Sequence, residues 1–562
     1  MSGLLLIAAW AWPLALAAVA HRPGFWWSPM VGVIPALLVL AVLPTESAPF
    51  VIPWMLFGAT FALDTLGWAF LAFSSLLWAV TSVFVSDRQR WGPRAGRLRV
   101  FFLLAMGGNL MLILAADGIS FFVGFALMGL AAYGLVAHQG GEQRRRAGRL
   151  YLAWTIVGEV ALFSGLVLAA HQAAGHLGLA ALAAGAAESQ LAFLLILMGF
   201  GIKAALPGLH PWLPVTYGHA PSATAAILSS AMIKAGLLGW LRFLPLGGEP
   251  LPIWGETLVW LGLIAVFGAS LIGLTQRLPG AILGYSSIAK MGILVLGLGL
   301  ILIDPALAPA GILALTLFAA HHALVKGGLF LGVELRRNLP RPSRVAPLVP
   351  IGLLGLALAL SDAPWSSGAL AKHQLEPLLT SGDWAWLKSA LTWATVGTLL
   401  LMARLLWVLW RLPASETTTS PAGLWAWGLL LVVIIGFPFV LGEGQDWSGT
   451  AWPLAIGIAI AIPFALLAWW RPHWTRGLIG LIPPGDILVV ARPLRRLVAR
   501  RLGPVRGLWN RARAAGIGLL QRIRPSPSDT NHDPERALRD WVMVGVLWLG
   551  IIALLAILLL AQ

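Results

Sequence analysis

Long apolar runs restrict the folds open to this chain more than any other feature of the sequence. Many of them hold about 20 mostly apolar residues, the length that an α-helix needs to cross the hydrocarbon core of a bilayer. Backbone N–H and C=O groups in hydrocarbon can bond only to one another, so such runs must be helices. With a mean hydropathy of +0.85 and only 11% charged residues, we expect an all-α polytopic membrane protein.

We predict about sixteen transmembrane helices from these runs. The predicted spans are residues 4–20, 25–43, 63–85, 100–115, 119–136, 151–170, 191–205, 223–244, 253–274, 281–303, 308–333, 348–379, 384–410, 424–440, 452–470 and 541–560. The first run lacks the basic residues that open a cleaved signal peptide, so we expect it to be the first helix.

The charges of the loops predict the orientation of these helices. Loops after the third, fifth and eleventh spans carry arginines: Arg88, Arg90, Arg94, Arg97, Arg99, Arg144, Arg145, Arg146, Arg149, Arg336, Arg337, Arg341 and Arg344. Loops after even-numbered spans are acidic, with Glu46, Glu188, Glu249, Asp304, Glu376, Asp383, Glu443 and Asp446. Because basic loops stay in the cytoplasm, we expect a multi-pass protein of the cell's inner membrane with both termini outside. This orientation explains the net charge of +16 better than a nucleic-acid partner does.

Lysine and arginine are distributed differently along the chain. Only six of the 38 basic residues are lysine, and five of these lie within apolar runs or at their breaks: Lys203, Lys234, Lys290, Lys326 and Lys372. A buried lysine gains and loses its proton far more readily than an arginine. Ionisable residues at membrane depth usually mark an ion path. A single lysine near a helix end could snorkel to the headgroups, but several lie near mid-span, so we expect a proton relay.

Two predicted spans are broken, and each break lies beside one of these lysines. Four prolines follow Lys203, namely Pro207, Pro211, Pro214 and Pro221, and Pro364 with a Ser-Ser-Gly run precedes Lys372. Non-helical backbone at membrane depth survives only where protein or a watery cavity satisfies it. Paired breaks favour two inverted repeats with an ion site near the midplane, whereas mere packing kinks would not explain the adjacent lysines.

We therefore predict six parts along the chain. They are an N-terminal group of three helices (1–97), a first five-helix repeat (98–244), a second five-helix repeat (253–410), two further helices (424–470), an amphipathic helix (487–524) and a final span (541–560). The 487–524 segment places ten arginines between apolar residues at helical spacing, as in a helix at the membrane surface. On the cytoplasmic side it could anchor to anionic lipid or strap a neighbouring subunit.

Several motifs in the chain occur in an order known from one protein family. They are Lys203, Pro207, His210, Trp212-Leu213-Pro214, His219-Ala220-Pro221, Met232-Ile233-Lys234-Ala235-Gly236, Tyr285-Ser286-Ser287-Ile288, Met291-Gly292, His322-Ala323-Leu324-Val325-Lys326 and Leu329-Phe330. In these motifs residues 98–410 resemble the antiporter-like subunits shared by respiratory complex I, membrane-bound energy-converting hydrogenases and Mrp-type cation/proton antiporters. Pro364, Gly368 and Lys372 resemble the second broken helix of that family.

The resemblance implies a proton path along the buried lysines. Lys203, Lys234, Lys326 and Lys372 would form a hydrated row across the middle of the membrane. Candidate relays beside them are Lys290, His210, His219, His321 and His322, although a lone histidine in a helix is more often a structural donor. We expect no cofactor or metal in this chain, because it has no cysteine and its adjacent histidines lack the spacing of metal ligands.

The chain departs from the family in its fifth helix. There the family usually has Trp-Glu-Leu-Met, whose glutamate pairs with the lysine of the seventh helix, and this chain has Phe125-Ala126-Leu127-Met128. A buried lysine without a counter-ion is costly. Because Glu159 is the only clear acid that we identify in mid-span, we expect it to replace the missing partner of Lys203. The alternative is that this half of the path is altered or inactive. Lys290 stands where relatives often have histidine or a neutral polar residue.

Three functions follow from the resemblance, and they differ in their partner subunits. The first is a proton-translocating subunit of a redox-driven complex that resembles a hydrogenase or an NADH/quinone oxidoreductase. The second is a subunit of an Mrp-type antiporter that exchanges Na⁺ or K⁺ for protons. The third is a proton-driven subunit for uptake of inorganic carbon together with a soluble zinc protein. A scaffold or lipid-binding protein would leave the five embedded lysines unexplained.

Overall fold

The computed structural model describes residues 2–87, 91–338, 347–380, 382–412, 421–442, 451–470 and 480–485. The chain separates into two compact units, Met1–Val490 and Ala491–Gln562, and all described residues lie in the first. The predicted amphipathic helix 487–524 and the final span 541–560 lie outside the described residues, as do several of the charged loop residues: Arg88, Arg90, Arg341, Arg344, Glu443 and Asp446.

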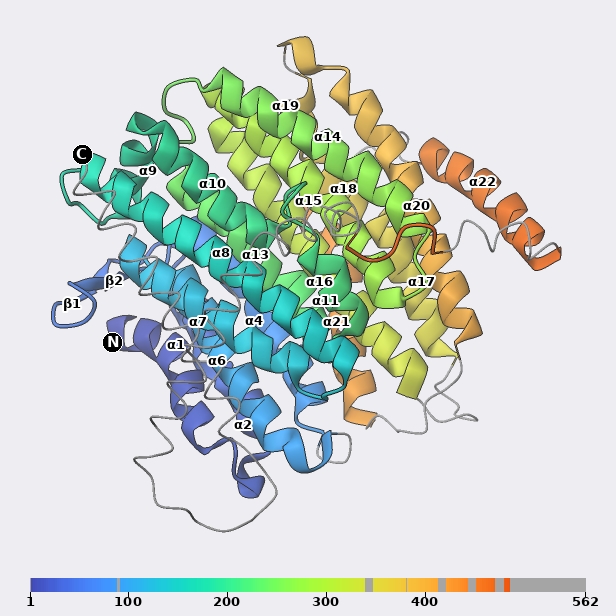
Figure 1. The fold of residues 1–562 in the computed structure, drawn as a ribbon, viewed down its shortest axis with the longest axis horizontal. Coiled ribbons are helices and arrows are strands. Elements are labelled where there is room, and N and C mark those ends of the chain that lie inside the picture. The colour runs from blue at the N-terminus through green and yellow to red at the C-terminus, as the bar shows by residue number, and fades with distance from the viewer. Residues whose placement is uncertain are drawn as a thin grey trace, which may run out of the picture. The chain divides into compact units, whose positions relative to one another are not determined.

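The first half of the described unit begins with helices, one small hairpin and then a long helical array (Figure 1). Its elements are α1 Ser2–Val19, η1 Pro23–Phe25, α2 Ser28–Gly32, α3 Ile34–Val42, β1 Phe50–Ile52, β2 Ala59–Phe61, α4 Thr65–Val85, η2 Gly92–Arg94, α6 Ala95–Leu114, α7 Gly118–Ala137, α8 Glu142–Gln172, α9 Leu179–Glu188, α10 Gln190–Ala204, α11 Trp212–His219, α12 Ser222–Ile227, the π-helical η3 Leu228–Met232 and α13 Ile233–Phe243. The strands β1 and β2 pair antiparallel, with Phe50 opposite Phe61.

The second half is also helical. Its elements are α14 Pro252–Leu274, α15 Pro279–Ile303, η4 Pro305–Leu307, α16 Ala308–Asn338, α17 Leu348–Leu360, α18 Ser367–His373, α19 Glu376–Leu379, η5 Gly382–Trp384, α20 Leu387–Arg411, α21 Pro421–Leu441 and α22 Ala451–Trp470. Helices α14 and α15 pack side by side along their lengths, as do α6 with α7 and α8 with α10 (Figure 1).

The all-α membrane class predicted from the sequence is confirmed. Among the described residues, eleven helical segments are long and apolar enough to cross a membrane, judged by length and composition. Four other predicted spans coincide with shorter apolar helices: Ser28–Val42, Gln190–Ala204, Leu348–Leu360 and Ala451–Leu467. The total of sixteen spans stays a prediction. Helix α9, which is too short to span a bilayer, was not predicted.

Short polar residues begin several of the helices, because their side chains accept hydrogen bonds from backbone N–H groups that the first turn leaves unpaired. The Asp64 carboxylate caps α4, and the Asp117 carboxylate caps α7. The hydroxyl groups of Ser189 and Ser366 cap α10 and α18, the two helices beside the predicted breaks. The starts of α10 and α18, which carry Lys203 and Lys372, are therefore encoded locally.

A buried arginine joins the first helices of the chain to the helical array. Arg242, in the last turn of α13, donates hydrogen bonds to Asp64 Oδ1 at 2.9 Å and to the carbonyl oxygens of Ala115 and Ile113 at 3.0 and 3.1 Å. Because Asp64 also caps α4, this one guanidinium ties α4, α6 and α13 together. Arg242 thus holds helices together inside the protein and does not belong to the arginines of the loops.

Glycines let the helices that carry the buried charges approach one another closely. A Cβ atom at Gly262 of α14 would lie 2.6 Å from the carbonyl oxygen of Gly292 in α15. A Cβ atom at Gly199 of α10 would lie 2.9 Å from the carbonyl oxygen of Gly158 in α8. Small residues at such contacts are the usual way in which membrane helices pack. These contacts place Lys290, Glu159 and Lys203 on helices with little freedom to shift.

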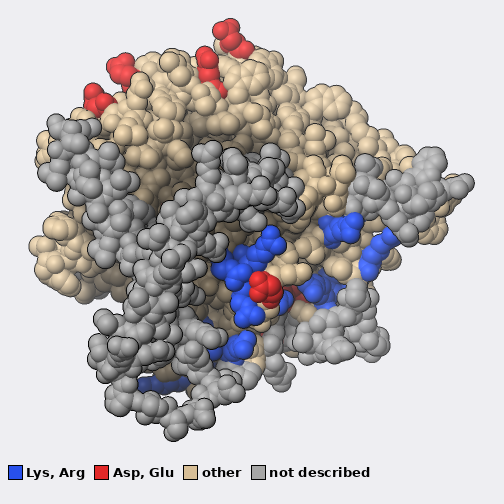
Figure 2. Space-filling model, in the orientation of Figure 1, with Lys and Arg blue, Asp and Glu red and all other residues tan. Residues whose placement is uncertain are grey.

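The loops of the described residues keep the charge asymmetry expected from the sequence. Acidic side chains gather along one edge of the visible face, and most lysine and arginine side chains lie towards the opposite end (Figure 2). Exposed acids in loops that the sequence predicts to be acidic are Glu188, Glu249, Asp304 and Asp383, and exposed arginines in or beside the predicted basic loops include Arg94, Arg97, Arg149 and Arg337.

The glycine contact between α14 and α15 gives a test of the fold. We expect Gly262→Ala to lower the free energy of unfolding by about 1–3 kcal/mol, because the added methyl group overpacks against the backbone of α15. Gly268→Ala, on the same helix with no atom within 4 Å of its Cβ position, is the matched control. Thermal unfolding of both variants in detergent measures the difference, and equal stability would contradict the close packing.

Candidate functional site

The five lysines singled out from the sequence all lie inside the helical unit. Lys203, Lys234, Lys290 and Lys326 are 5%, 0%, 2% and 0% exposed, and Lys372 is half-buried. They come from α10, α13, α15, α16 and α18. Burying an ammonium group without a partner is costly, so the groups around each lysine determine what it can do.

The first break lies directly after Lys203. Helix α10 ends at Ala204, and Ala205 adopts the left-handed conformation with φ 60°. The N–H of Leu206 donates to the carbonyl oxygen of Gly201 at 2.8 Å, and Trp212 Nε1 donates to the carbonyl oxygen of Ile202 at 2.8 Å. The free carbonyl groups at a helix C-terminus favour a cation, so the break itself offers a polar setting for the Lys203 ammonium.

Glu159 lies beside Lys203, as expected from the sequence. Lys203 Nζ donates a hydrogen bond to the Tyr151 hydroxyl at 3.1 Å, and that hydroxyl donates to the carbonyl oxygen of Gly129 at 3.0 Å. A Cβ atom at Gly129 would lie 2.6 Å from Glu159 Oε1 and 3.6 Å from Lys203 Nζ, so both charged groups border the same glycine. The Phe125 ring centroid is 5.6 Å from Lys203 Nζ, where a π face can also favour the cation.

The centre of the site is formed by Lys234, His322 and Lys326, all 0% exposed. Their charges are close enough to act on one another. Lys326 Nζ donates to the carbonyl oxygen of Leu283 at 2.8 Å, whereas Lys234 Nζ and both ring nitrogens of His322 have no hydrogen-bond partner among the described residues. Buried polar groups of this kind are usually satisfied by water, which fits the hydrated row expected from the resemblance.

The helix that carries Lys234 is irregular just before the lysine. Residues Leu228–Met232 form one π-helical turn between α12 and α13. Such turns are frequent at functional sites, because the extra residue redirects the side chains that follow. The sequence analysis predicted a continuous helix over 223–244 and missed this turn, since no proline or glycine lies between residues 228 and 232.

The second break holds a buried carboxylate that the sequence analysis overlooked. Asp362 lies two residues after the end of α17 and is 3% exposed. Its Oδ1 and Oδ2 atoms lie 3.1 and 3.4 Å from Lys290 Nζ. The description of Glu159 as the only clear mid-span acid was therefore wrong. An aspartate two residues before Pro364, inside an apolar run, was the signal that could have found it.

A chain of hydrogen bonds leads from this carboxylate to Lys372. The Thr395 hydroxyl, on α20, donates to Asp362 Oδ2 at 2.7 Å and accepts from Lys372 Nζ at 2.9 Å. Thr395 is 1% exposed. The structure thus brings two lysines to one carboxylate. The residues involved come from α15, α18 and α20 and from the break itself.

The histidines named from the sequence take different positions. His321 Nδ1 lies 2.9 Å from the Ser367 hydroxyl, in the cluster around Asp362, and His322 lies with the central lysines. His210 lies between α10 and α11 and is 8% exposed. His219 is half-buried, and its Nδ1 lies 2.8 Å from the carbonyl oxygen of Val215 one turn earlier. Its contacts are those of a structural histidine at the end of α11.

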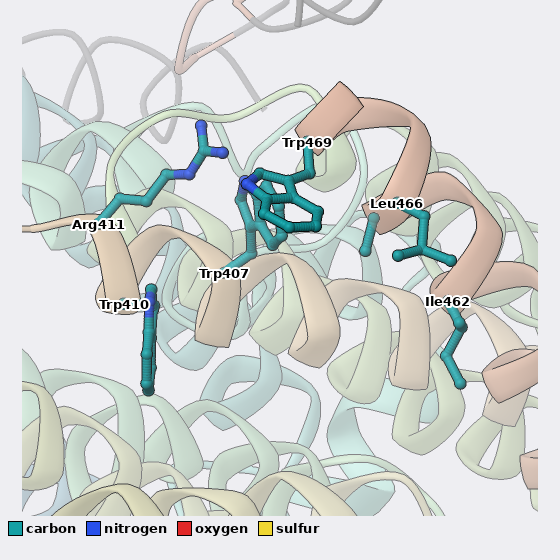
Figure 3. A pocket seen from close by; sticks show the side chains of 7 residues that line it. Trp407, Trp410, Arg411, Ile462, Leu466 and Trp469 are labelled. Atoms are coloured by element: carbon teal, nitrogen blue, oxygen red, sulfur yellow. The ribbon is translucent and has the colours of Figure 1, made fainter. Parts of the chain in front are cut away.

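A surface groove of about 570 Å³ lies away from this site, between α20 and α22. Its walls are mainly tryptophan rings and aliphatic side chains: Trp407, Trp410, Arg411, Ile462, Ala465, Leu466 and Trp469 (Figure 3). The Arg411 guanidinium lies 4.3 Å from the centre of the Trp407 ring. None of the predicted site residues lines this groove, so it does not form part of the buried site.

A comparison with known families decides what kind of protein carries this site. The model of a family described as "NADH:quinone oxidoreductase/Mrp antiporter, TM" matches residues 115–398, just over half of the 562 residues. This chain belongs to that family. The matched region includes all five buried lysines, Glu159 and Asp362.

Individual relatives of this antiporter family cover parts of the chain. Hydrogenase-4 component B of Escherichia coli is 30% identical over 301 residues, which are 51% of this chain and 45% of the relative. NADH-quinone oxidoreductase subunit N of Desulforudis audaxviator is 31% identical over 312 residues, 52% of this chain and 60% of the relative. The aligned region thus spans about half the length of these curated relatives.

Solved structures share the fold over nearly the whole chain. A chain of the Mrp complex from Dietzia superposes with a TM-score of 0.71 at 22% identity, covering 97% of this chain and 66% of its own. A chain of the archaeal membrane-bound sulfane sulfur reductase superposes with a TM-score of 0.66 at 18% identity, covering 97% and 99%. By their descriptions, the first chain belongs to an Mrp complex and the second to an archaeal respiratory membrane complex.

The buried pair of Lys290 and Asp362 gives a test of the site. We expect Lys290→Met and Asp362→Leu, made singly, each to lower the free energy of unfolding by about 3–5 kcal/mol, because each leaves an unpaired buried charge. The double variant should recover most of that loss, since apolar groups then face each other. Thermal unfolding in detergent measures all three variants. If the two losses simply add in the double variant, the two groups are not an ion pair.

Proposed function

We propose that this chain is a proton-translocating membrane subunit of a multi-subunit complex, in which protons move along the buried lysines. The observation that carries the proposal is the presence of five lysines inside the helical unit. Five ammonium groups lie inside a membrane-spanning helical unit, with a carboxylate beside the lysines at both helix breaks. Membership of the antiporter family, which includes complexes that move ions, supports it.

Electrostatic coupling between neighbours would pass a change along the row. Lys234 and Lys290 each lie near enough to Lys326 for their charges to interact with its charge. At separations of several ångströms in a partly hydrated site, that interaction is on the order of a few kcal/mol. When one lysine gains a proton, its positive charge therefore makes protonation of the next lysine less favourable. If a neighbouring subunit changes the protonation of the lysine at one end, that change can then pass along the row in one direction.

Lys372 lies near an acidic side chain at the protein surface. The Lys372 charge interacts with Glu376, which is 38% exposed. Glu376 also pairs with His373 at 3.6 Å and with Lys388 at 3.2 Å, both of them partly exposed. This surface group offers Lys372 a short route to water. In the proposed orientation, with the arginine-rich loops in the cytoplasm, that water lies on the outer side of the membrane.

We favour a redox-driven complex of the hydrogenase or NADH-quinone oxidoreductase kind as the assembly. The curated relatives described above are named as components of such enzymes, and the chain has no cysteine for an iron–sulfur cluster of its own. The second candidate is an Mrp-type cation/proton antiporter, which the fold similarity to a chain of the Mrp complex supports.

Substitution of the lysines beside the breaks tests the proton path. We expect Lys203→Ala and Lys372→Ala to lower coupled proton transport at least about 100-fold, while the protein still inserts and assembles. Transport is measured with a pH-sensitive dye in liposomes that hold the purified complex. The matched control is Arg149→Ala, because Arg149 is 60% exposed at the surface, pairs with Glu142 rather than with a residue of the proposed path, and should leave transport unchanged. Full transport in both variants would remove the two lysines from the path.

The proposed partner of Lys203 is tested separately. Glu159→Gln keeps the size of the side chain but removes its ability to bind and release a proton, so Lys203 loses the acid beside it. We expect a severe loss of transport, again at least about 100-fold, with normal assembly. Wild-type transport in Glu159→Gln would show that this carboxylate does not replace the one missing from the fifth predicted helix.

Purification from the native membrane distinguishes the two assemblies. Gentle extraction followed by mass spectrometry identifies the subunits that remain bound. Hydrogenase-like or quinone-reductase subunits are the expected result and would support a redox-driven pump. Small Mrp-type subunits would overturn that choice in favour of a cation/proton antiporter, and a large soluble zinc protein would point to carbon uptake.

A further inference from the structure

Asp362 is linked to two lysines, one directly and one through a hydroxyl group. It contacts Lys290 directly, at 3.1 and 3.4 Å, and it reaches Lys372 through the Thr395 hydroxyl, by hydrogen bonds of 2.7 and 2.9 Å. A structural ion pair needs only one lysine. The additional link through a buried hydroxyl is what a proton-transfer route requires, because a hydroxyl can accept a proton from the ammonium on one side while it donates its own proton to the carboxylate on the other.

We propose that Asp362 and Thr395 form the proton-transfer link between Lys290 and Lys372, and that the charge on Lys290 controls it. The proposal rests on the proton-translocating function proposed above and names the residues that perform one step of it. Neither residue was among those picked out from the sequence.

The step conserves protons and bonds. Lys372 Nζ–H⁺ gives its proton to the Thr395 oxygen, and the Thr395 hydroxyl gives its own proton to Asp362 Oδ2. Lys372 becomes a neutral amine, Asp362 becomes a neutral carboxylic acid, and Thr395 is again a hydroxyl with its O–H turned towards Lys372. The reverse sequence returns the proton. No other reactant is needed.

Lys290 determines when this step is favourable. Four polar side chains face Asp362 from the elements packed around it: Lys290 of α15, His321 of α16, Lys372 of α18 and Thr395 of α20. A charged Lys290 stabilises Asp362 as a carboxylate and so opposes transfer from Lys372. Once Lys290 has lost its proton to the central lysines, the carboxylate has no direct cation, and transfer from Lys372 neutralises both remaining charges.

The backbone around the second break holds Asp362 in this position. Asp362 has φ 57°, a left-handed conformation that costs an aspartate energy and persists only where the surroundings enforce it. Its N–H donates to the carbonyl oxygen of Ala359 at 3.2 Å, and the N–H of Ala363 donates to that of Leu358 at 3.1 Å. A Cβ atom at Gly368 would collide with the Ala359 carbonyl, so α18 passes closely over the break.

Substitutions of Thr395 test the link without changing any charge. We expect Thr395→Val, which keeps the shape and removes the hydroxyl, to lower proton transport about 100-fold in liposomes holding the complex. Thr395→Ser keeps the hydroxyl and should restore transport to near the wild-type rate. The matched control is Thr398→Val, since Thr398 is one turn away on α20, equally buried, and donates only to the carbonyl oxygen of Ala394.

Infrared difference spectroscopy of the same samples separates this proposal from the function on which it rests. Over a pH titration, the wild-type protein should show a protonated-carboxyl band that Asp362→Asn abolishes and Thr395→Val reduces or shifts. Wild-type transport in Thr395→Val, or no such band at any pH, would overturn the link while leaving the proton path intact. A wild-type complex that moves no protons would instead overturn the proposed function.

Discussion

Hydrocarbon cannot solvate the end of a helix, and this constraint governs the two places where helices stop inside the protein. After α10, the carbonyl groups of Gly201 and Ile202 accept from Leu206 N–H and Trp212 Nε1. After α17, the carbonyl groups of Leu358 and Ala359 accept from Ala363 and Asp362 N–H. Each break is therefore closed by protein groups. With the backbone groups paired, the polar group left at each break is an ionisable side chain, Lys203 at the first and Asp362 at the second.

Close packing turns these local features into one connected site. Glycine contacts between α8 and α10 bring Glu159 and Lys203 to the same glycine, Gly129. Glycine contacts between α14 and α15 hold Lys290 at a depth where it meets Asp362. Larger side chains at those contacts would overpack against the backbone of the facing helix. The arrangement of charges thus depends on residues that carry no charge themselves.

The sequence analysis identified the lysines because their rarity and their place in apolar runs need no knowledge of tertiary contacts. It found Glu159 for a similar reason, since a lysine in mid-span requires an anion and few acids lay at that depth. It missed Asp362, because the break in 348–379 was interpreted through its proline and its lysine alone. It also missed the π-helical turn at Leu228–Met232, which follows from packing and not from the residues of the turn.

The sequence by itself determined the helical class, the approximate spans, the charge asymmetry of the loops and the depth of the lysines, because each follows from the transfer of residues between water and hydrocarbon. Only the tertiary structure decided which groups meet. Lys290 and Asp362 are 72 residues apart, and Thr395 is 33 residues beyond Asp362. Whether such residues touch depends on helix rotation and on distances of a few ångströms, which are set by the packing of the whole helical unit and by no local pattern.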